Sequence, residues 1–202
     1  MQIFITGTDT DIGKTTVSSW LCLHSTYSYF KPIQTGSDVG SDSKILSKII
    51  QNTIYPEIYC YKKPLSPHLA SSLENQEINL ENIILPKAHN LIVEGAGGVL
   101  VPINKNQLII DLIKYLELPV ILVTKPYLGT INHTLLSIAA LSARQINILG
   151  FIMNGEENKY NSDAIEYYGK IPLLATIPTL TQITKESLLN IPLTDALKAI
   201  LR

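Results

Sequence analysis

The chain has 202 residues, of which 46% are hydrophobic and 16% are charged, and its 16 basic and 17 acidic residues nearly balance. This length suits one domain, the aliphatic content excludes intrinsic disorder, and the lack of a basic surplus argues against a nucleic-acid partner. The two cysteines, Cys22 and Cys60, are too few for a disulfide framework. No signal peptide is recognisable, and no apolar run reaches the roughly 18 to 20 residues of a membrane span. We therefore expect one cytoplasmic domain over residues 1–202 with no nucleic-acid or membrane partner.

Short apolar segments alternate with segments of helical periodicity. The expected strands are residues 2–6, 27–33, 90–93, 119–124, 148–153 and, more weakly, 173–177, and the expected helices are residues 15–23, 43–50, 108–116 and 131–145. Several strand segments are apolar throughout, which is typical of parallel strands covered on both faces. The alternation predicts an α/β fold, a doubly wound and mostly parallel sheet with helices on both faces. Residues 54–88 are less regular, and we expect them to form an insertion with short helices over the carboxyl edge of the sheet.

The first expected strand leads into the segment GTDTDIGKTT at residues 7–16. Ligands bind such sheets at the carboxyl ends of the strands, and this segment has the ending and the setting of a P-loop. Its glycines let backbone amides face a phosphate, and the following helix adds a favourable dipole. In a P-loop, Lys14 contacts the β- and γ-phosphates and the Thr15 hydroxyl binds Mg²⁺. The alternative, a glycine turn with a solvated lysine, does not explain the strand–loop–helix setting.

Two details of this loop are unusual. Five residues separate Gly7 from Gly13, where four are usual. P-loop ATPases that switch through dimerisation carry an additional lysine early in the loop, where this chain has Thr8 and Asp9. The carboxylates of Asp9 and Asp11 would repel a triphosphate. They fit this loop if one of them contacts a cationic ligand, or if the backbone N–H group rather than the carboxylate faces the nucleotide.

Charged residues follow two more of the expected strands or head a helix. Lys31 lies in the last part of the second strand. A buried ammonium at this place needs an anionic partner. The alternative is that the aliphatic part of the side chain is buried and the ammonium extends to the surface. Asp42 heads the next helical segment, where it suits an N-cap or a site ligand. Glu94 follows the third strand and opens the segment EGAGG at residues 94–98. It occupies the place of the second magnesium-binding acid of P-loop enzymes, with a plain surface acid as the alternative.

Residues 125–134, KPYLGTINHT, follow the strand at residues 119–124 and include the start of a helix. The free amides of its first turn, with the side chains of Thr130 and Asn132, suit a carboxylate, and helix capping is an equal alternative. We interpret His133 as a structural histidine. The strand at residues 148–153 is followed by Asn154, whose side-chain amide can contact a base edge.

Together these motifs resemble the dethiobiotin synthetase family from residue 3 to about residue 180. The resemblance is carried by residues 7–15, 31–36, 41–42, 66–68, 93–98, 129–133 and 177–178, and the five-residue spacing in the P-loop is the pattern of that family. The resemblance implies that the protein is an ATP-dependent ligase of biotin biosynthesis. It also implies a homodimer in which the substrate binds near the subunit interface. The implied reaction closes the ureido ring of dethiobiotin from 7,8-diaminopelargonate and CO₂ or bicarbonate. A carbamate forms first, its oxygen attacks the γ-phosphate of ATP, and the second amine closes the ring on the carbamic–phosphoric anhydride.

The resemblance also implies roles for individual residues. Lys14 and Lys31 are the implied catalytic residues. Thr15, Asp42 and Glu94 are the implied ligands of Mg²⁺. The implied ATP-binding residues are Asp11, Ile12, Gly13, Lys14, Thr15, Thr16, Asp42, Glu94, Gly95, Ala96, Gly97, Asn154, Pro178, Thr179 and Leu180, of which Asn154 reads adenine and the last three line the base pocket. The implied substrate-binding residues are Thr35, Gly129, Thr130, Asn132 and Tyr167.

Two other functions compete with this expectation. The first is a non-catalytic nucleotide-binding switch of the same fold. Such a switch would not need Lys31 and Thr35 in addition to the P-loop, and this chain has both. The synthetase part of a cobyrinate-type amide-forming enzyme is normally joined to a glutamine-hydrolysing domain, for which 202 residues leave no space. The chain departs from the family where Gly155 replaces a frequent acid and where the loop between Gly36 and Asp42 is short. Residues 181–202 show no match, and we assign them no role.

Overall fold

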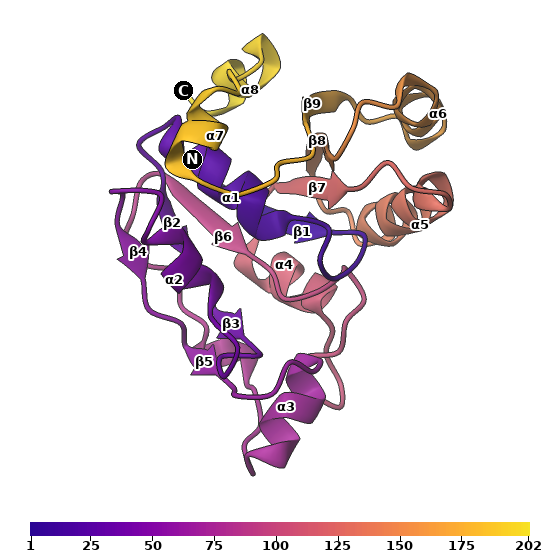
Figure 1. Ribbon diagram of the computed structural model, residues 1–202. Coiled ribbons are helices and arrows are strands. Elements are labelled where there is room, and N and C mark those ends of the chain that lie inside the picture. Colours follow the sequence, from indigo (N-terminus) through magenta and orange to yellow (C-terminus); the bar gives the residue numbers. More distant parts are fainter.

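A computed structural model describes residues 1–202 and places seven strands in one sheet, in the order β4-β2-β6-β1-β7-β8-β9 (Figure 1). These strands are β1 Gln2–Gly7, β2 Ser28–Phe30, β4 Ile54–Tyr55, β6 Leu91–Glu94, β7 Val120–Thr124, β8 Ile148–Asn154 and β9 Leu173–Ile177. A second, two-stranded sheet joins β3 Ile33–Gln34 to β5 Tyr59–Cys60. All neighbours in the large sheet pair in parallel, so their carboxyl ends meet at one edge. The predicted α/β fold class is confirmed.

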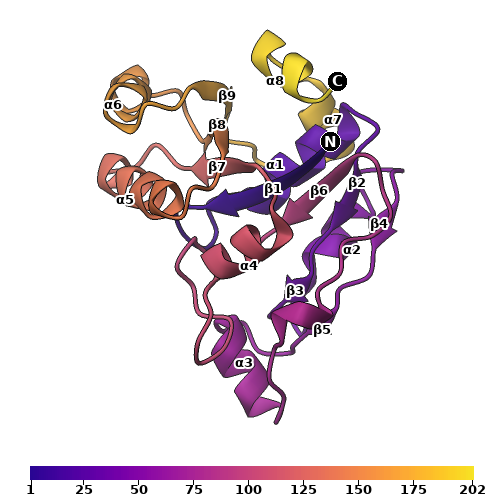
Figure 2. The ribbon, with the colours of Figure 1, turned by 180° about the vertical axis from the view of Figure 1, so that it is seen from behind.

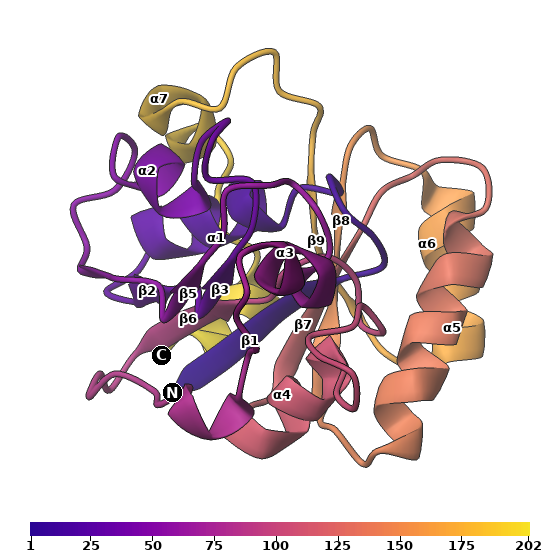
Figure 3. The ribbon, with the colours of Figure 1, turned by 90° about the horizontal axis from the view of Figure 1, so that it is seen from below.

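Helices cover both faces of the large sheet (Figures 1, 2 and 3). The helices of the chain are α1 Lys14–Leu23, α2 Asp42–Leu46, α3 Pro67–Leu73, η1 Leu80–Asn82, α4 Ile109–Leu116, α5 Thr130–Ala143, α6 Lys159–Gly169, α7 Lys185–Leu189 and α8 Asp195–Ile200. One buried apolar cluster joins the sheet to α1, α2, α7 and α8, and the other joins it to α4, α5 and α6. In β1, Phe4 belongs to one cluster and Ile5 to the other. Successive side chains of a strand point to opposite faces, which explains why this segment is apolar throughout.

The predicted strand at residues 27–33 was wrong in its extent, because the structure divides it after Phe30. Pro32 has no N–H group to give to a sheet, and its carbonyl accepts hydrogen bonds from Ile58 and Tyr59 instead. The division carries Lys31 out of the large sheet at its carboxyl edge. The helix expected at residues 43–50 is also shorter than predicted and ends at Leu46.

The insertion at residues 54–88 is partly as expected. It contains two short helices, α3 and η1, and its residues 64–67 line the cleft at the carboxyl edge of the sheet. The sequence did not reveal that the insertion begins with β4, which extends the large sheet beside β2. A two-residue strand is too short to show a periodicity.

The last part of the chain completes the core on the α1 face. Leu188 of α7 and Leu197 of α8 are fully buried in the same apolar cluster as Trp20 of α1. The Trp20 indole N–H also donates to the carbonyl of Ile191 at 2.8 Å. Residues 181–202, to which the sequence assigned no role, therefore support the helix that follows the P-loop. None of the helices is both long and apolar enough to cross a membrane.

Candidate active site

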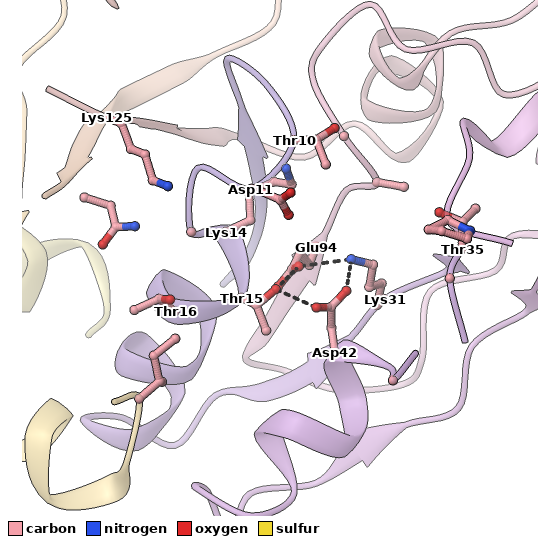
Figure 4. A pocket seen from close by; sticks show the side chains of 18 of the residues that line it. Thr10, Asp11, Lys14, Thr15, Thr16, Lys31, Thr35, Asp42, Glu94 and Lys125 are labelled. Atoms are coloured by element: carbon pink, nitrogen blue, oxygen red, sulfur yellow. Dashed lines mark hydrogen bonds and ion pairs between the residues drawn. The ribbon is translucent and has the colours of Figure 1, made fainter. Parts of the chain in front are cut away.

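A cleft of about 1080 Å³ opens at the carboxyl edge of the large sheet. Its walls come from the P-loop after β1, from the loops that follow β2, β3, β6, β7, β8 and β9, and from residues 64–67 of the insertion. Figure 4 shows labelled side chains of the P-loop and α1 around the same space as Lys31, Asp42, Glu94 and Lys125. The cleft lies where parallel α/β sheets bind their ligands.

The P-loop is shaped by backbone conformations that few residues tolerate. Gly13 has a φ of 95°, and a Cβ atom at this position would collide with the side-chain amide of Asn154. That amide donates to the carbonyl of Ile12 at 2.9 Å, so Asn154 supports the loop across the cleft. Asp11 also has a positive φ, 55°, which aspartate tolerates better than most residues.

Lys14 lies at the base of the cleft and is nearly buried. Burial lowers the pKa of its ammonium from 10.5 to about 8, although the nearby carboxylate of Glu94 opposes the shift. Its Nζ donates to the carbonyl of Asp9 at 2.9 Å. A neutral carbonyl is a weak partner for an ammonium, so a phosphate in the cleft offers Lys14 a better one.

Behind Lys14, three charged side chains and one hydroxyl form a connected cluster. The Thr15 hydroxyl lies 2.8 Å from Asp42 Oδ1 and 3.0 Å from Glu94 Oε1. Lys31 Nζ pairs with Asp42 Oδ2 and, at 3.1 Å, with Glu94 Oε1 (Figure 4). Glu94 is fully buried and Lys31 is 5% exposed, so neither is a surface charge. The predicted anionic partner of Lys31 is confirmed, and the N-cap of α2 is Ser41 rather than Asp42.

The charges in this cluster stabilise one another. Burial acts to lower the pKa of Lys31, but the carboxylates of Glu94 and Asp42 outweigh it, and the pKa lies above 10.5. Burial likewise acts to raise the pKa of Asp42, but the ammonium of Lys31 outweighs it and the pKa falls below 3.8. At neutral pH these two side chains are therefore an ammonium and a carboxylate.

The predicted metal ligands fit Mg²⁺ in their chemistry. A hydroxyl and two carboxylates supply only oxygen atoms, and Mg²⁺ prefers oxygen ligands. Both carboxylates lie within hydrogen-bond distance of the same Thr15 hydroxyl. Such a sparse protein set is typical of Mg²⁺ bound together with substrate phosphates.

The sequence did not single out three residues that support this cluster. The hydroxyls of Ser18 and Tyr29 donate to Glu94 Oε2, at 2.7 Å and 3.1 Å. The side-chain carbonyl of Gln34 accepts from the backbone N–H of Asp42 at 3.0 Å. Periodicity offered a signal for two of them, since Ser18 lies about one helical turn after Thr15, and Tyr29 lies two residues before Lys31, which is the same-face spacing in the strand predicted at residues 27–33.

Most of the other predicted nucleotide-binding residues line the cleft. Those that line it are Asp11, Gly13, Lys14, Thr15, Thr16, Asp42, Glu94, Ala96, Gly97, Asn154, Thr179 and Leu180, together with Thr35 of the substrate set. Three do not, namely Ile12, Gly95 and Pro178. Gly95 packs on Phe4, and a Cβ atom there would lie 2.8 Å from its ring. Lys125 and Tyr127 line the cleft although no role was predicted for them.

The remaining predicted substrate residues lie outside this cleft. Gly129 precedes α5 with a φ of 96°, and the buried Thr130 hydroxyl lies 2.7 Å from that of Thr124. Asn132 is exposed on the first turn of α5. Tyr167 is 66% exposed on α6, where its ring contacts Tyr168 and the ammonium of Lys170. One chain by itself does not bring Tyr167 into the cleft.

A second, smaller hollow adjoins the start of α5. It is lined by Thr8, Asp9, Gly98, Val99, Leu100, Val101, Pro102, His133, Leu136 and Ser137. Two exposed leucines form an apolar rim on this hollow, since Leu136 and Leu100 line it and are 61% and 54% exposed. This hollow and its apolar rim are features that the sequence did not predict.

Known proteins show clear similarity to this chain over most of its length. A family model described as an AAA domain matches residues 1–187. The ATP-dependent dethiobiotin synthetase BioD of Lawsonia intracellularis is 61% identical over 98% of this chain and 98% of its own length. The protein of the same name from Paramagnetospirillum magneticum is 43% identical over 94% of each chain. The expectation that the similarity ends near residue 180 was wrong, because the first alignment covers nearly the whole chain.

Solved structures of more distant proteins share the fold. A ParA family ATPase from Chlorobium tepidum superimposes with a TM-score of 0.56 at 15% identity, covering 93% of this chain and 87% of its own. The cell division ATPase MinD of Pyrococcus furiosus gives a TM-score of 0.51 at 18% identity, covering 99% and 95%. At such identities the likeness shows the P-loop NTPase fold alone.

Proposed function

The chain belongs to the dethiobiotin synthetase family, and from this premise we propose that its cleft closes the ureido ring of dethiobiotin from 7,8-diaminopelargonate, CO₂ and ATP. As in its relatives, the activity is that of an ATP-dependent ligase of biotin biosynthesis. The observation that carries the chemical part of the proposal is the buried cluster of Lys31, Asp42 and Glu94 around the Thr15 hydroxyl, next to the P-loop.

The reaction needs little covalent help from the protein. One amine of the substrate adds to CO₂ and loses a proton, which gives a carbamate. A carbamate oxygen attacks the γ-phosphorus and ADP leaves, which gives the carbamic–phosphoric anhydride. The second amine attacks the carbonyl carbon, the ring closes and phosphate leaves. Because the substrate brings both nucleophiles, the protein has to hold the reactants in line and stabilise negative charge.

The P-loop end of the cleft is where the nucleotide belongs. Its amides and Lys14 face the β- and γ-phosphates, with Thr16 beside them on the first turn of α1. Asn154, which contacts the P-loop at Ile12, lines the cleft together with Thr179 and Leu180, with Pro178 next to them in the chain, and these residues suit the base. Asn154 already donates to Ile12, which leaves its side-chain carbonyl to accept from the amino group of adenine.

Thr15, Asp42 and Glu94 would hold Mg²⁺ between the protein and the phosphates. The metal ion, when bound, supplies positive charge that neutralises the phosphate oxygens. Lys31 keeps its positive charge at neutral pH because two carboxylates surround it. Its ammonium can therefore stabilise negative charge on the carbamate and on the transferred phosphoryl group, and Thr35 lines the same part of the cleft.

The carboxylate tail of the substrate belongs at the first turn of α5, where Gly129, Thr130 and Asn132 lie. Tyr167 lies near the end of α6, lines neither the cleft nor the smaller hollow and is 66% exposed, so we assign it a role only in a homodimer. The apolar rim of the smaller hollow supports such a homodimer, because Leu136 and Leu100 are 61% and 54% exposed there and pairing would remove them from water. Pairing of two chains over this surface would bury the rim and close the hollow over the substrate.

A phosphate-release assay tests the proposed function. We expect the protein to convert ATP to ADP and phosphate only when both 7,8-diaminopelargonate and bicarbonate are present. Lys31→Ala should lower the rate by about 10²- to 10³-fold, because it removes a charge that acts on the transition state. Lys87→Ala is the matched control, since Lys87 is exposed and forms no ion pair. Phosphate release without the diamine, or an undiminished rate in Lys31→Ala, would contradict the proposal.

A further inference from the structure

The two oxygens of the Glu94 carboxylate have different surroundings. Oε1 faces the Thr15 hydroxyl at 3.0 Å and the Lys31 ammonium at 3.1 Å, on the side of the cleft. Oε2 faces the interior, where it accepts from the Ser18 hydroxyl at 2.7 Å and the Tyr29 hydroxyl at 3.1 Å. Glu94 lines the cleft although its side chain is fully buried, so bulk water has little access to either oxygen. One oxygen is thus available to a ligand and the other is anchored in the protein.

We propose that Tyr29 and Ser18 are positioning residues that fix the plane of the Glu94 carboxylate and thereby set the affinity of the site for Mg²⁺ with nucleotide. The inference rests on the proposed function to the extent that it takes Glu94 as a metal ligand. Neither residue touches the cleft, so both act through Glu94 alone.

A glutamate needs such an anchor because its last side-chain torsion is broad and allows the carboxylate plane to turn. The two hydroxyls reach Oε2 from different elements, Ser18 from α1 and Tyr29 from β2, so the oxygen is held from two directions. Tyr29 is itself fully buried on an interior strand of the sheet, which leaves its ring little room to move. The hydroxyl of each residue has Glu94 as its hydrogen-bond partner.

The chain offers a matched comparison for Tyr29. Tyr27 lies two residues earlier and is equally buried, but its hydroxyl has no hydrogen-bond partner. Tyr27→Phe and Tyr29→Phe remove the same atom from neighbouring buried positions. The second change alone removes a hydrogen bond to Glu94, so a difference between the two variants reports on this contact.

The test is a calorimetric titration with a non-hydrolysable ATP analogue at increasing Mg²⁺ concentration. Loss of an outer partner of a metal ligand typically weakens metal binding by 10- to 100-fold. We therefore expect Tyr29→Phe to raise the Mg²⁺ concentration at half-maximal binding by about 10-fold. Binding of the analogue without Mg²⁺ should stay as in the wild type, and Tyr27→Phe should leave both quantities unchanged. A purely structural role of Tyr29 would weaken binding with and without Mg²⁺ alike.

The inference would be overturned if Tyr29→Phe and Tyr27→Phe required the same Mg²⁺ concentration for half-maximal binding, which we call the Mg²⁺ midpoint. Ser18→Ala provides a second test, because it removes the other anchor without changing the strand, and we expect it to raise the midpoint as well. If Tyr29→Phe does not fold, an unchanged midpoint in Ser18→Ala overturns the inference by itself. The proposed function is judged separately by diamine-dependent phosphate release in the wild type. A wild type without that activity but with a shifted midpoint in Tyr29→Phe would contradict the function and leave the inference standing.

Discussion

The two parts of the proposed substrate-binding surface differ in how complete they are within one chain. The charged cluster, meaning Lys31, Asp42, Glu94 and the Thr15 hydroxyl, is largely buried and connected by hydrogen bonds and ion pairs. The start of α5 is open by comparison, with Asn132 exposed and the Thr130 hydroxyl turned inward to Thr124.

This difference follows from what each part has to do. Charge stabilisation works best with groups that are already oriented and shielded from water, and the ends of buried parallel strands provide such a place. Binding of a substrate tail requires contact area and selectivity, which exposed loops and a second chain can supply. One chain is therefore prepared for the phosphate chemistry, whereas the tail site depends, in our proposal, on a homodimer.

The largest effect should come from removing the cation of the charged cluster. Lys31→Met leaves two carboxylates facing each other, and we expect the free energy of unfolding to fall by about 3–5 kcal/mol. The double variant Lys31→Met/Glu94→Gln should recover part of this loss without recovering activity. Urea unfolding at neutral pH measures both changes, and a Lys31→Met variant as stable as the wild type would contradict the buried ion pairs.

This cluster also has a predictable dependence on pH. The lowered pKa of Asp42 contributes stability that is present at neutral pH and is lost as the pH falls through that lowered pKa. Without the ammonium of Lys31, burial is the stronger influence and should raise the pKa of Asp42, so the free energy of unfolding of Lys31→Met should show less of this acid-induced loss than that of the wild type.

An intermediate effect of opposite sign is expected at Lys14. Burial lowers the pKa of Lys14 from 10.5 to about 8. Below pH 8 the ligand-free protein therefore holds a buried charged lysine, which lowers its free energy of unfolding. One pKa unit corresponds to about 1.4 kcal/mol, so Lys14→Met should stabilise the ligand-free protein by about 1–3 kcal/mol at pH 7 while it abolishes tight nucleotide binding.

The pH dependence separates this effect from simple packing. Wild-type stability should rise between pH 8 and 10.5, where the folded protein holds the neutral lysine, and Lys14→Met should lack this rise. Nucleotide affinity of the wild type should decline above pH 8, because phosphate prefers the ammonium. Lys87→Met, at an exposed position, should change stability by less than about 0.5 kcal/mol. A Lys14→Met variant less stable than the wild type would refute the cost assigned to burial.

The smallest effect on the fold is expected at the start of α5. Asn132→Ala should leave the free energy of unfolding within about 0.5 kcal/mol of the wild type, because the side chain is exposed. It should raise the KM for 7,8-diaminopelargonate by about 10-fold, the worth of one hydrogen bond to a charged group, and leave the KM for ATP unchanged. Thr130→Val, which removes a buried hydroxyl, should instead lower stability by about 1 kcal/mol. Equal changes in both KM values for Asn132→Ala would place this residue at the nucleotide rather than at the tail.

Much of the fold and of the charged cluster could be predicted because the determining patterns are local. Continuous apolar segments indicated parallel strands, and the position of Lys31 in the last part of one such segment and of Glu94 directly after another indicated the carboxyl edge of the sheet. The boundaries were less predictable. The strand at residues 27–33 breaks because Pro32 cannot donate a hydrogen bond, and β4 is too short to leave a pattern. The helices α6, α7 and α8 were missed altogether.

The sequence by itself determined the class of fold, the phosphate-binding loop and the kinds of side chain that meet at the edge of the sheet. Only the tertiary structure decided how they meet. Tyr29 of β2 and Glu94 of β6 lie on the face of the sheet on which α1 packs. This packing brings Ser18 of α1, as well as Tyr29, to the inner oxygen of Glu94. The packing of α1 in turn depends on Leu188 and Leu197, far along the chain. Such contacts join residues that are distant in sequence, and no local pattern records which oxygen of a carboxylate will face the ligand.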